Sequence, residues 1–386
     1  MDKFAIHATK FLLAGGVRGE GYLPIEEGKF GSWSSCRPSC KIIEAGDSWV
    51  APGFVDTHIH GFYNHDVMDL DPCGINIARK KLAKAGTTSW LATTLTASIE
   101  QTDKACRAVV EASRLQGTDF IGCKTQGIFL EGPFFTEKHK GAQNSSYMMD
   151  PSVEVFDGWQ KSAEGTIKKS AIAPERDNTK AYCQALKDRG VVVALGHSDA
   201  TSDQGCSAID AGASVFVHTY NAMSGLHHRQ PGLVGCAMTQ KNTYAEIICD
   251  GLHVNPVAIQ ALICAKGWDH VFVVSDCLRC GGMPEGKYML GEFPIVMKEG
   301  VCRLDDETHN IAGSVITMQK AVQNLYKWQI VTAEQALRMG TEVAARANNI
   351  DDVCGSIMCG RDADFVILDN ELNLIDTYIS GVKVED

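Results

Sequence analysis

Two histidines, His58 and His60, lie two residues apart at the end of an apolar run that follows a Pro-Gly turn. Side chains alternate between the two faces of a strand, so this spacing directs both imidazoles to the same side, where they can bind one metal ion. The alternative interpretation is a pair of histidines on a solvated strand face. The spacing predicts part of a metal site whose other ligands must come from elsewhere in the chain.

Further residues of the metal-ligand or acid-base type follow apolar runs later in the chain. They are Glu131, His197, His218 and Asp276. A single histidine at a strand end is more often a packing residue, and a single carboxylate is often a helix cap. Because residues of this kind recur at the same kind of position, we predict that they share one metal site.

Strand-like apolar runs alternate with helical stretches between residues 53 and 276, which is the pattern of repeated βα units. The eight runs lie near residues 53–60, 87–95, 126–131, 169–174, 191–197, 214–218, 244–250 and 271–276, and the helical stretches include 75–85, 98–115, 179–189, 202–211 and 256–266. This alternation predicts an α/β fold, a (β/α)8 TIM barrel. The carboxyl ends of its strands meet at one face, which would bring the candidate residues together.

Both ends of the chain contain short strand-like pieces broken by Gly and Pro. Because the two ends have the same pattern, we expect them to form one small β-sandwich domain. The expected boundaries are residues 1–50 and 354–386 for this domain and residues 51–353 for the barrel.

The composition limits the partners of the 386-residue chain. Its formal net charge of −11 argues against binding to nucleic acid or to an anionic membrane. The sequence lacks the pattern of an export signal and any long apolar segment, so we expect a cytoplasmic protein. In that compartment we expect the 15 cysteines, including the Cys277 and Cys280 pair, to be mostly free thiols rather than a zinc or redox centre.

Several longer strings resemble the amidohydrolase superfamily of metal-dependent hydrolases and, more narrowly, its N-acetylglucosamine-6-phosphate deacetylase family, over nearly the whole chain. The strings are residues 52–56 (PGFVD), 130–134 (LEGPF), 140–142 (KGA), 173–175 (APE), 196–201 (GHSDAT), 218–223 (HTYNAM), 231–233 (PGL), 250–253 (DGLH) and 312–314 (AGS). The paired histidines are common to the superfamily. The LEGP and HTYNAM strings are much more specific and carry the narrower resemblance.

The resemblance implies a set of metal ligands. Glu131, His197 and His218 would bind the principal divalent ion, with Glu131 in the place where relatives outside the family often have a modified lysine. His58 and His60 would bind a second ion, which only some family members carry. Imidazole and carboxylate ligands together favour Zn²⁺ or Fe²⁺. We therefore expect one or two such ions in each subunit.

The reaction that the resemblance implies is removal of the acetyl group from N-acetylglucosamine 6-phosphate, which gives glucosamine 6-phosphate and acetate in amino sugar catabolism. An amide is a poor electrophile and water a poor nucleophile, so the ion must polarise the first and lower the pKa of the second. Asp276 is the expected general base and acid, taking a proton from water and delivering it to the departing nitrogen. The alternative for Asp276 is an ordinary ligand or cap.

The same resemblance implies the contacts of this small amino sugar phosphate. Arg229 would bind phosphate oxygens through its guanidinium fork, with His253 as a second contact, although its HHRQP string alone predicts a solvated basic loop. In relatives a neighbouring subunit helps to complete the pocket, so we expect a homodimer or homotetramer, with His228 at the shared edge. Further pocket groups would come from Ala142, Asn221, Ala222, Ile311, Ala312 and Gly313.

Two other interpretations stay open. The same barrel and metal ligands serve deaminases, dihydroorotases, dipeptidases and deacetylases of isomeric sugars such as N-acetylgalactosamine 6-phosphate. Within this group, Arg229 and residues 221–223 favour a sugar phosphate over a nucleobase. The other interpretation is a catalytically silent barrel that acts as a binding protein. Such proteins usually lose metal ligands, whereas this chain has the full set.

Overall fold

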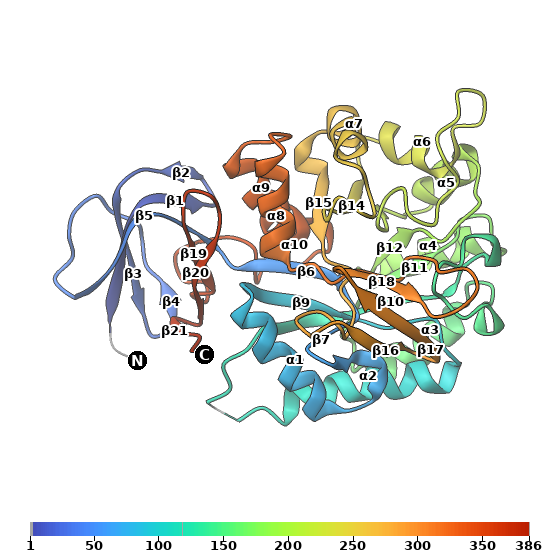
Figure 1. The fold of residues 1–386 in the computed structure, drawn as a ribbon, viewed down its shortest axis with the longest axis horizontal. Coiled ribbons are helices and arrows are strands. Elements are labelled where there is room, and N and C mark those ends of the chain that lie inside the picture. Colours follow the sequence, from blue (N-terminus) through green and yellow to red (C-terminus); the bar gives the residue numbers. More distant parts are fainter. Residues whose placement is uncertain (1–2, 118, 386) are drawn as a thin grey trace.

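The computed structural model describes residues 3–117 and 119–385 and contains a barrel of parallel strands surrounded by helices (Figure 1). The barrel closes between its last and first strands, where the N–H of His60 donates to the carbonyl of Cys277 at 3.0 Å. Each predicted run overlaps one barrel strand, so the TIM-barrel prediction is confirmed. The eight strands pair in chain order: β6 (Phe54–Ile59), β9 (Thr87–Thr93), β10 (Lys124–Phe134), β11 (Ile167–Ile172), β12 (Val192–Leu195), β13 (Val215–Phe216), β14 (Tyr244–Ile248) and β15 (Val271–Val274).

Helices cover the outside of the barrel, and side chains fill its interior. As a result, β6 and β9 are buried along their whole length, which is typical of parallel strands covered on both faces. Side-chain oxygens of Asp71, Ser98 and Thr201 cap the first turns of α1, α2 and α5. The α-helices are α1 (Pro72–Lys84), α2 (Ile99–Arg114), α3 (Val153–Ser162), α4 (Thr179–Asp188), α5 (Ser202–Asp210), α6 (Gly232–Thr239), α7 (Pro256–Lys266), α8 (Met318–Lys327), α9 (Ala333–Met339) and α10 (Glu342–Ala347).

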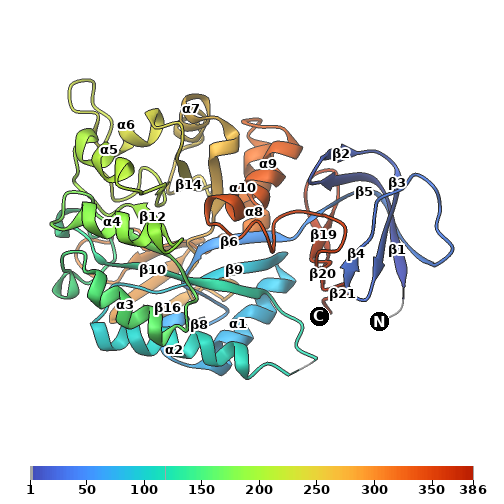
Figure 2. The same ribbon diagram turned by 180° about the vertical axis from the view of Figure 1, so that it is seen from behind.

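Strands from both ends of the chain form a second sheet, separate from the barrel, as expected. Strand β5 joins the two ends because it pairs in parallel with β1 and antiparallel with β19. Figures 1 and 2 show this sheet beside the barrel, with both marked chain ends on it. Its strands are β1 (Phe4–Leu13), β2 (Gly16–Arg18), β3 (Gly21–Glu26), β4 (Lys29–Phe30), β5 (Lys41–Pro52), β19 (Phe365–Leu368), β20 (Leu374–Ile379) and β21 (Val382–Lys383).

Two small antiparallel sheets were not predicted from the sequence. One contains β16 (Gly286–Leu290), β17 (Phe293–Lys298) and β18 (Val301–Leu304), and the other contains β7 (Gly61–Phe62) and β8 (His65–Asp66). Leu290 of β16 packs in a hydrophobic cluster with Leu278, which follows the last barrel strand. The larger sheet is therefore anchored beside the carboxyl ends of the barrel strands. Short 3-10 helices complete the fold: η1 (Val67–Asp69), η2 (Glu137–His139), η3 (Ser145–Tyr147) and η4 (Trp268–His270).

Within the described parts of the chain, none of the helices has the length and apolar character that crossing a membrane requires.

Candidate metal centre

Six side chains meet at the carboxyl ends of the barrel strands. His58 and Glu131 lie within β6 and β10, and the other four lie one or two residues beyond a strand end. All six are buried, with at most 8% of any residue exposed. The barrel thus brings together every residue that the sequence suggested for metal binding and proton transfer, namely His58, His60, Glu131, His197, His218 and Asp276.

The backbone is strained at three of these positions. His197, His218 and Asp276 have φ values of 46°, 27° and 50°, in the left-handed region that residues with a Cβ rarely adopt. Such conformations persist where the surrounding structure imposes them, and they concentrate at functional sites. Here each strained residue turns the chain immediately after a barrel strand while its side chain joins the cluster.

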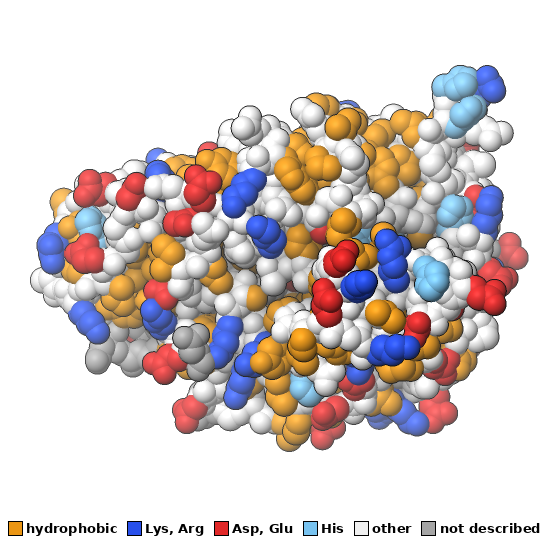
Figure 3. Space-filling model, viewed as in Figure 1, with side chains coloured by type: hydrophobic (Ala, Val, Ile, Leu, Met, Phe, Trp, Pro, Cys, Tyr) orange, Lys and Arg blue, Asp and Glu red, His pale blue; other side chains and the backbone are white. Residues whose placement is uncertain are grey.

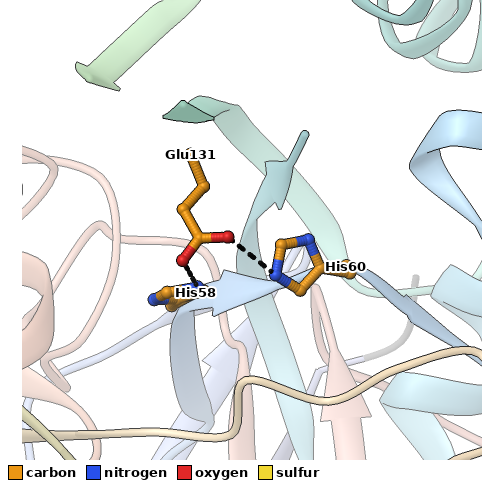
Figure 4. A group of neighbouring side chains, drawn as sticks. All are labelled: His58, His60 and Glu131. Carbon is orange, nitrogen blue, oxygen red and sulfur yellow. Dashed lines mark ion pairs between the residues drawn. The ribbon is translucent and has the colours of Figure 1, made fainter. Parts of the chain in front are cut away.

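Glu131 is the centre of the cluster. Its Oε1 lies 3.3 Å from Nε2 of His58 and 3.2 Å from Nε2 of both His197 and His218. Its Oε2 lies 3.3 Å from Nε2 of His60. Figure 4 shows the carboxylate between His58 and His60, with one oxygen directed at each imidazole. Glu131 can therefore contribute ligand atoms to two neighbouring sites.

The donor atoms fit a divalent transition metal. Two groups have ligand atoms close enough to share an ion: His58, His60 and Glu131, and Glu131, His197 and His218. Nε2 atoms of His197 and His218 lie only 3.0 Å apart, and the buried Nε2 of His58 has no hydrogen-bond partner. Buried polar atoms are normally satisfied, so facing nitrogens of this kind call for a shared cation. This chain therefore has the features of a metal-binding protein.

Two of the imidazoles are oriented by their other ring nitrogen. Nδ1 of His58 donates to Glu246 at 2.9 Å, and Nδ1 of His197 donates to the carbonyl of His139 at 2.9 Å. A hydrogen bond of this kind fixes which nitrogen carries the proton and leaves Nε2 free to bind a metal. The ligands are thus held in the binding orientation by contacts outside the cluster.

Asp276 lies against the histidine pair. Its Oδ1 is 3.4 Å from Nε2 of His58 and 3.3 Å from Nε2 of His60. Burial acts to raise the pKa of Asp276, but the neighbouring His58 and His60 outweigh it and hold that pKa below its ordinary value. The carboxylate is therefore kept ionised, as a proton acceptor must be.

A cavity of about 200 Å³ opens over this cluster. His60, Glu131 and Asp276 form part of its wall, and Leu290 of the β16–β18 sheet forms another part. Ala312 is buried and does not reach this wall, so the structure places only its neighbours there. The predicted substrate contacts that line the cavity are Ala142, Asn221, Ala222, His253, Ile311 and Gly313.

Arg229 and His228 lie away from this cavity. They occupy the exposed loop between β13 and α6, where Nη1 of Arg229 is 2.8 Å from Nε2 of His228. Figure 1 shows this loop, yellow-green beside α6, extending from the barrel, and Figure 3 shows His and basic side chains at its tip. The structure therefore does not bring the Arg229 side chain to the cavity of its own chain.

Sequence reasoning missed Gln143, Glu246 and Lys169. The side chain of Gln143 is buried and lines the cavity, and its Nε2 donates to Oε2 of Glu131 at 2.5 Å. Glu246 and Lys169 form an ion pair inside the barrel. The available signal was their polarity: charged residues stood at positions 169 and 246 within two of the predicted strand runs, where apolar residues are expected.

None of the 15 described cysteines forms a disulfide in the structure. Sγ of Cys280 lies 2.8 Å from Sγ of Cys302 in β18. Cys277 lies next to Asp276 in the chain but is buried. No described cysteine belongs to either candidate metal group.

Comparison with known proteins places the chain in a class that fits this barrel and this cluster. Residues 49–384 match the amidohydrolase family, and the chain belongs to that family.

Curated relatives and solved structures narrow the similarity. The chain is 34% identical to the N-acetylglucosamine-6-phosphate deacetylase of Bacillus subtilis (strain 168), over 94% of this chain and 92% of the relative. It is 34% identical to the N-acetylgalactosamine-6-phosphate deacetylase of Escherichia coli O157:H7, over 88% and 89%. Among solved structures, a mutant N-acetyl-D-glucosamine-6-phosphate deacetylase from Mycobacterium smegmatis, in complex with N-acetyl-D-glucosamine-6-phosphate, aligns with a TM-score of 0.93 and 29% identity over 100% of both chains.

Proposed function

We propose that this chain is a metal-dependent deacetylase that converts N-acetylglucosamine 6-phosphate and water into glucosamine 6-phosphate and acetate. The observation that carries the proposal is the position of Asp276, which lines the same cavity as Glu131, His197 and His218. That arrangement combines a proton acceptor with a metal-ligand group in one cavity. Full-length relatives named as deacetylases of this substrate support the choice of reaction.

Glu131, His197 and His218 would hold the principal ion, and His58, His60 and Glu131 would hold a second. The mixed imidazole and carboxylate donors favour Zn²⁺ or Fe²⁺. A bound ion of this type polarises the amide carbonyl and lowers the pKa of water. Glu131 contacts both groups, with Oε1 near His58, His197 and His218 and Oε2 near His60, which supports a proposal of two ions.

Asp276 would then move the proton that hydrolysis requires. Its ionised carboxylate accepts a proton from the attacking water and afterwards donates it to the nitrogen that leaves the acetyl group. Attack forms the new carbon–oxygen bond, and departure of the protonated nitrogen breaks the carbon–nitrogen bond. Burial of Asp276 in the cavity wall keeps bulk water from competing for this proton.

The sugar phosphate would be bound by groups around the cavity, including Asn221, His253 and the backbone near Ala142 and Gly313. Hydrogen bonding to Asp250 and its charge outweigh burial and raise the pKa of His253, which favours the cationic form that attracts a phosphate. This single cation is a modest site for a phosphate dianion, and Arg229 of the same chain lies outside the cavity.

We propose a homodimer or homotetramer for this reason. The exposed loop that carries His228 and Arg229 extends away from its own barrel, so a second copy is the natural recipient of these side chains. The guanidinium would supply the bidentate phosphate contact that the cavity wall lacks. The cytoplasmic location, the role in amino sugar catabolism and the domain boundaries at residues 50/51 and 353/354 are proposed as well.

The test is an acetate-release assay on enzyme of measured metal content. The substrates are N-acetylglucosamine and N-acetylgalactosamine, each with and without a 6-phosphate. We expect the highest kcat/KM with N-acetylglucosamine 6-phosphate and little turnover of unphosphorylated sugars. Release of acetate from none of the four would overturn the proposal.

The isomeric N-acetylgalactosamine 6-phosphate is the second candidate substrate. A relative named for that activity has the same 34% identity to this chain as the glucosamine-named relative from Bacillus subtilis. Both sugars carry the same acetamido and phosphate groups, so the metal ligands and Asp276 do not distinguish them. The ratio of the two kcat/KM values in the same assay decides between them.

A further inference from the structure

A charged pair lies inside the barrel beneath the metal ligands. Nζ of Lys169, on β11, forms an ion pair with Oε1 of Glu246, on β14. Oε2 of the same Glu246 lies 2.9 Å from Nδ1 of His58. The side chains of Lys169, Glu246 and His58 are each fully buried. The three groups form one continuous polar chain that ends at a metal-ligand histidine.

Glu246 also contacts the other candidate ion site. Its Oε2 accepts a hydrogen bond from the backbone N–H of His218 at 2.9 Å. His218 is one of the residues with a strained, positive φ, and this bond holds its backbone at that point. One carboxylate oxygen therefore contacts a residue from each of the two metal groups.

Stability alone does not explain a buried pair of this kind. Moving a lysine and a glutamate out of water costs several kcal/mol, and replacing such pairs by apolar residues of similar volume is often neutral or stabilising. Lys169 lies against the ring of Phe129, 4.0 Å from its centroid, in surroundings that a methionine would suit. The pair is better explained by the contacts that Glu246 makes with His58 and His218.

We propose that Glu246, neutralised by Lys169, is a positioning residue that keeps the proton of His58 on Nδ1 and so directs Nε2 to the second ion. By holding the backbone of His218 with the same oxygen, it also links the two ion sites. This inference rests on the proposed metal site but not on the identity of the substrate, because its test measures metal binding rather than acetate release.

The experiment compares two double variants. Both remove the buried charges: Lys169→Met with Glu246→Gln, and Lys169→Met with Glu246→Leu. The glutamine keeps an oxygen that accepts the Nδ1 proton of His58, whereas the leucine does not. Lys266→Met is the matched control, because it removes another buried lysine, one whose Nζ donates to Gln240 and Thr243 instead of to Glu246.

Zn²⁺ binding to each purified protein is measured by chelator competition, and folding by circular dichroism and thermal unfolding. We expect the leucine variant to bind the second ion about 10- to 100-fold more weakly than wild type, with the glutamine variant between the two and the control unchanged. Equal second-ion affinity in folded leucine and glutamine variants would overturn the proposal.

If the leucine variant fails to fold, a measurement on the wild-type protein tests the proposal instead. In the Zn²⁺-loaded wild-type protein, nitrogen-15 spectra report which ring nitrogen of His58 carries hydrogen, with the signals assigned by their loss in His58→Gln. The proposal requires the hydrogen on Nδ1. Hydrogen on Nε2 would contradict it. The proposed deacetylase reaction is tested separately, by the acetate assay.

Discussion

The side-chain amide of Gln143 binds Glu131 directly: Nε2 donates to Oε2 at 2.5 Å. The other end of the same amide accepts the backbone N–H of Thr96 at 2.8 Å, which fixes its orientation. Oε2 is the oxygen of Glu131 that lies toward His60. Gln143 therefore holds the central carboxylate of the cluster from the side of the second ion group.

Replacement of Gln143 by leucine is expected to weaken binding of the second ion. The change removes the donor to Glu131 and leaves the buried Thr96 N–H without an acceptor. We expect metal affinity or turnover to fall by about 10- to 100-fold, measured by chelator competition and acetate release. Gln143→Glu keeps an acceptor for Thr96 but replaces the donor to Glu131 with a second carboxylate oxygen. A loss confined to the leucine variant would assign the effect to Thr96 and contradict a role toward Glu131.

Replacement of Asp276 by asparagine should separate proton transfer from metal binding. Asparagine preserves the shape of the side chain but cannot accept the proton from water. We expect normal metal content and a kcat lower by about 10²- to 10⁴-fold. Acetate release and elemental analysis of the same preparation provide the measurement. Turnover close to wild type would remove Asp276 from the mechanism.

Removal of the metal should destabilise the protein. Without an ion, the buried Nε2 of His58 has no hydrogen-bond partner, and the Nε2 atoms of His197 and His218 face each other at 3.0 Å. We expect chelator-treated protein to unfold at a lower temperature and Zn²⁺ to restore the transition. Titration should reach two ions per chain in wild type and one in His60→Gln. One ion per wild-type chain with full activity would exclude the two-ion proposal.

Arg229→Ala should raise KM much more for the phosphorylated than for the unphosphorylated sugar, because the guanidinium is proposed to bind phosphate. The exposed position of Arg229 adds a stronger test. If Arg229 acts on a second copy, an Arg229→Ala subunit can be paired with an Asp276→Asn subunit. The first keeps Asp276 and the second supplies Arg229, so one site of the mixed assembly is intact. When the two variants are mixed and exchange subunits, activity at low substrate concentration should be recovered. No recovery in verified mixed assemblies would count against sharing between subunits.

The buried Lys266 provides a test by pH. Burial lowers the pKa of Lys266 from 10.5 to about 8. Between these two values the unfolded chain binds more protons than the folded one, so this group makes the folded state more stable as pH rises. Lys266→Met lacks the effect. The free energy of unfolding of the variant minus that of the wild type should therefore decrease from pH 8 to about 10.5. We expect a decrease of at most about 3 kcal/mol, measured by urea denaturation. A pH-independent difference would contradict the lowered pKa.

The sequence was sufficient to predict the barrel and the position of the cluster because both follow from local patterns. A run of apolar residues marks a strand, and residues such as His197 or Asp276 at its end must lie at one face of a parallel barrel. The role of Glu246 could not be found in this way. It depends on which side chain of β6 faces β14 across the interior, a relation that spacing along the chain does not contain.

Arg229 illustrates a different limit. Resemblance suggested that it binds the substrate, but the sequence does not show that the loop between β13 and α6 holds Arg229 outside the cavity of its own chain. The β16–β18 sheet was missed because its strands are short, with exposed residues such as Lys287 and Met289, and lie outside the βα alternation. Elements that cover the cavity are thus less predictable than the strands that support it.

The pairing of β5 has a consequence for the order in which the protein can be completed during synthesis. One edge of β5 meets β1 as soon as the first 52 residues are available, but the other edge meets β19, which is made more than 300 residues later. A growing chain therefore carries an open strand edge throughout translation of the barrel. Any truncation before Phe365 leaves that edge exposed to pairing with other chains, which makes incomplete copies prone to aggregate.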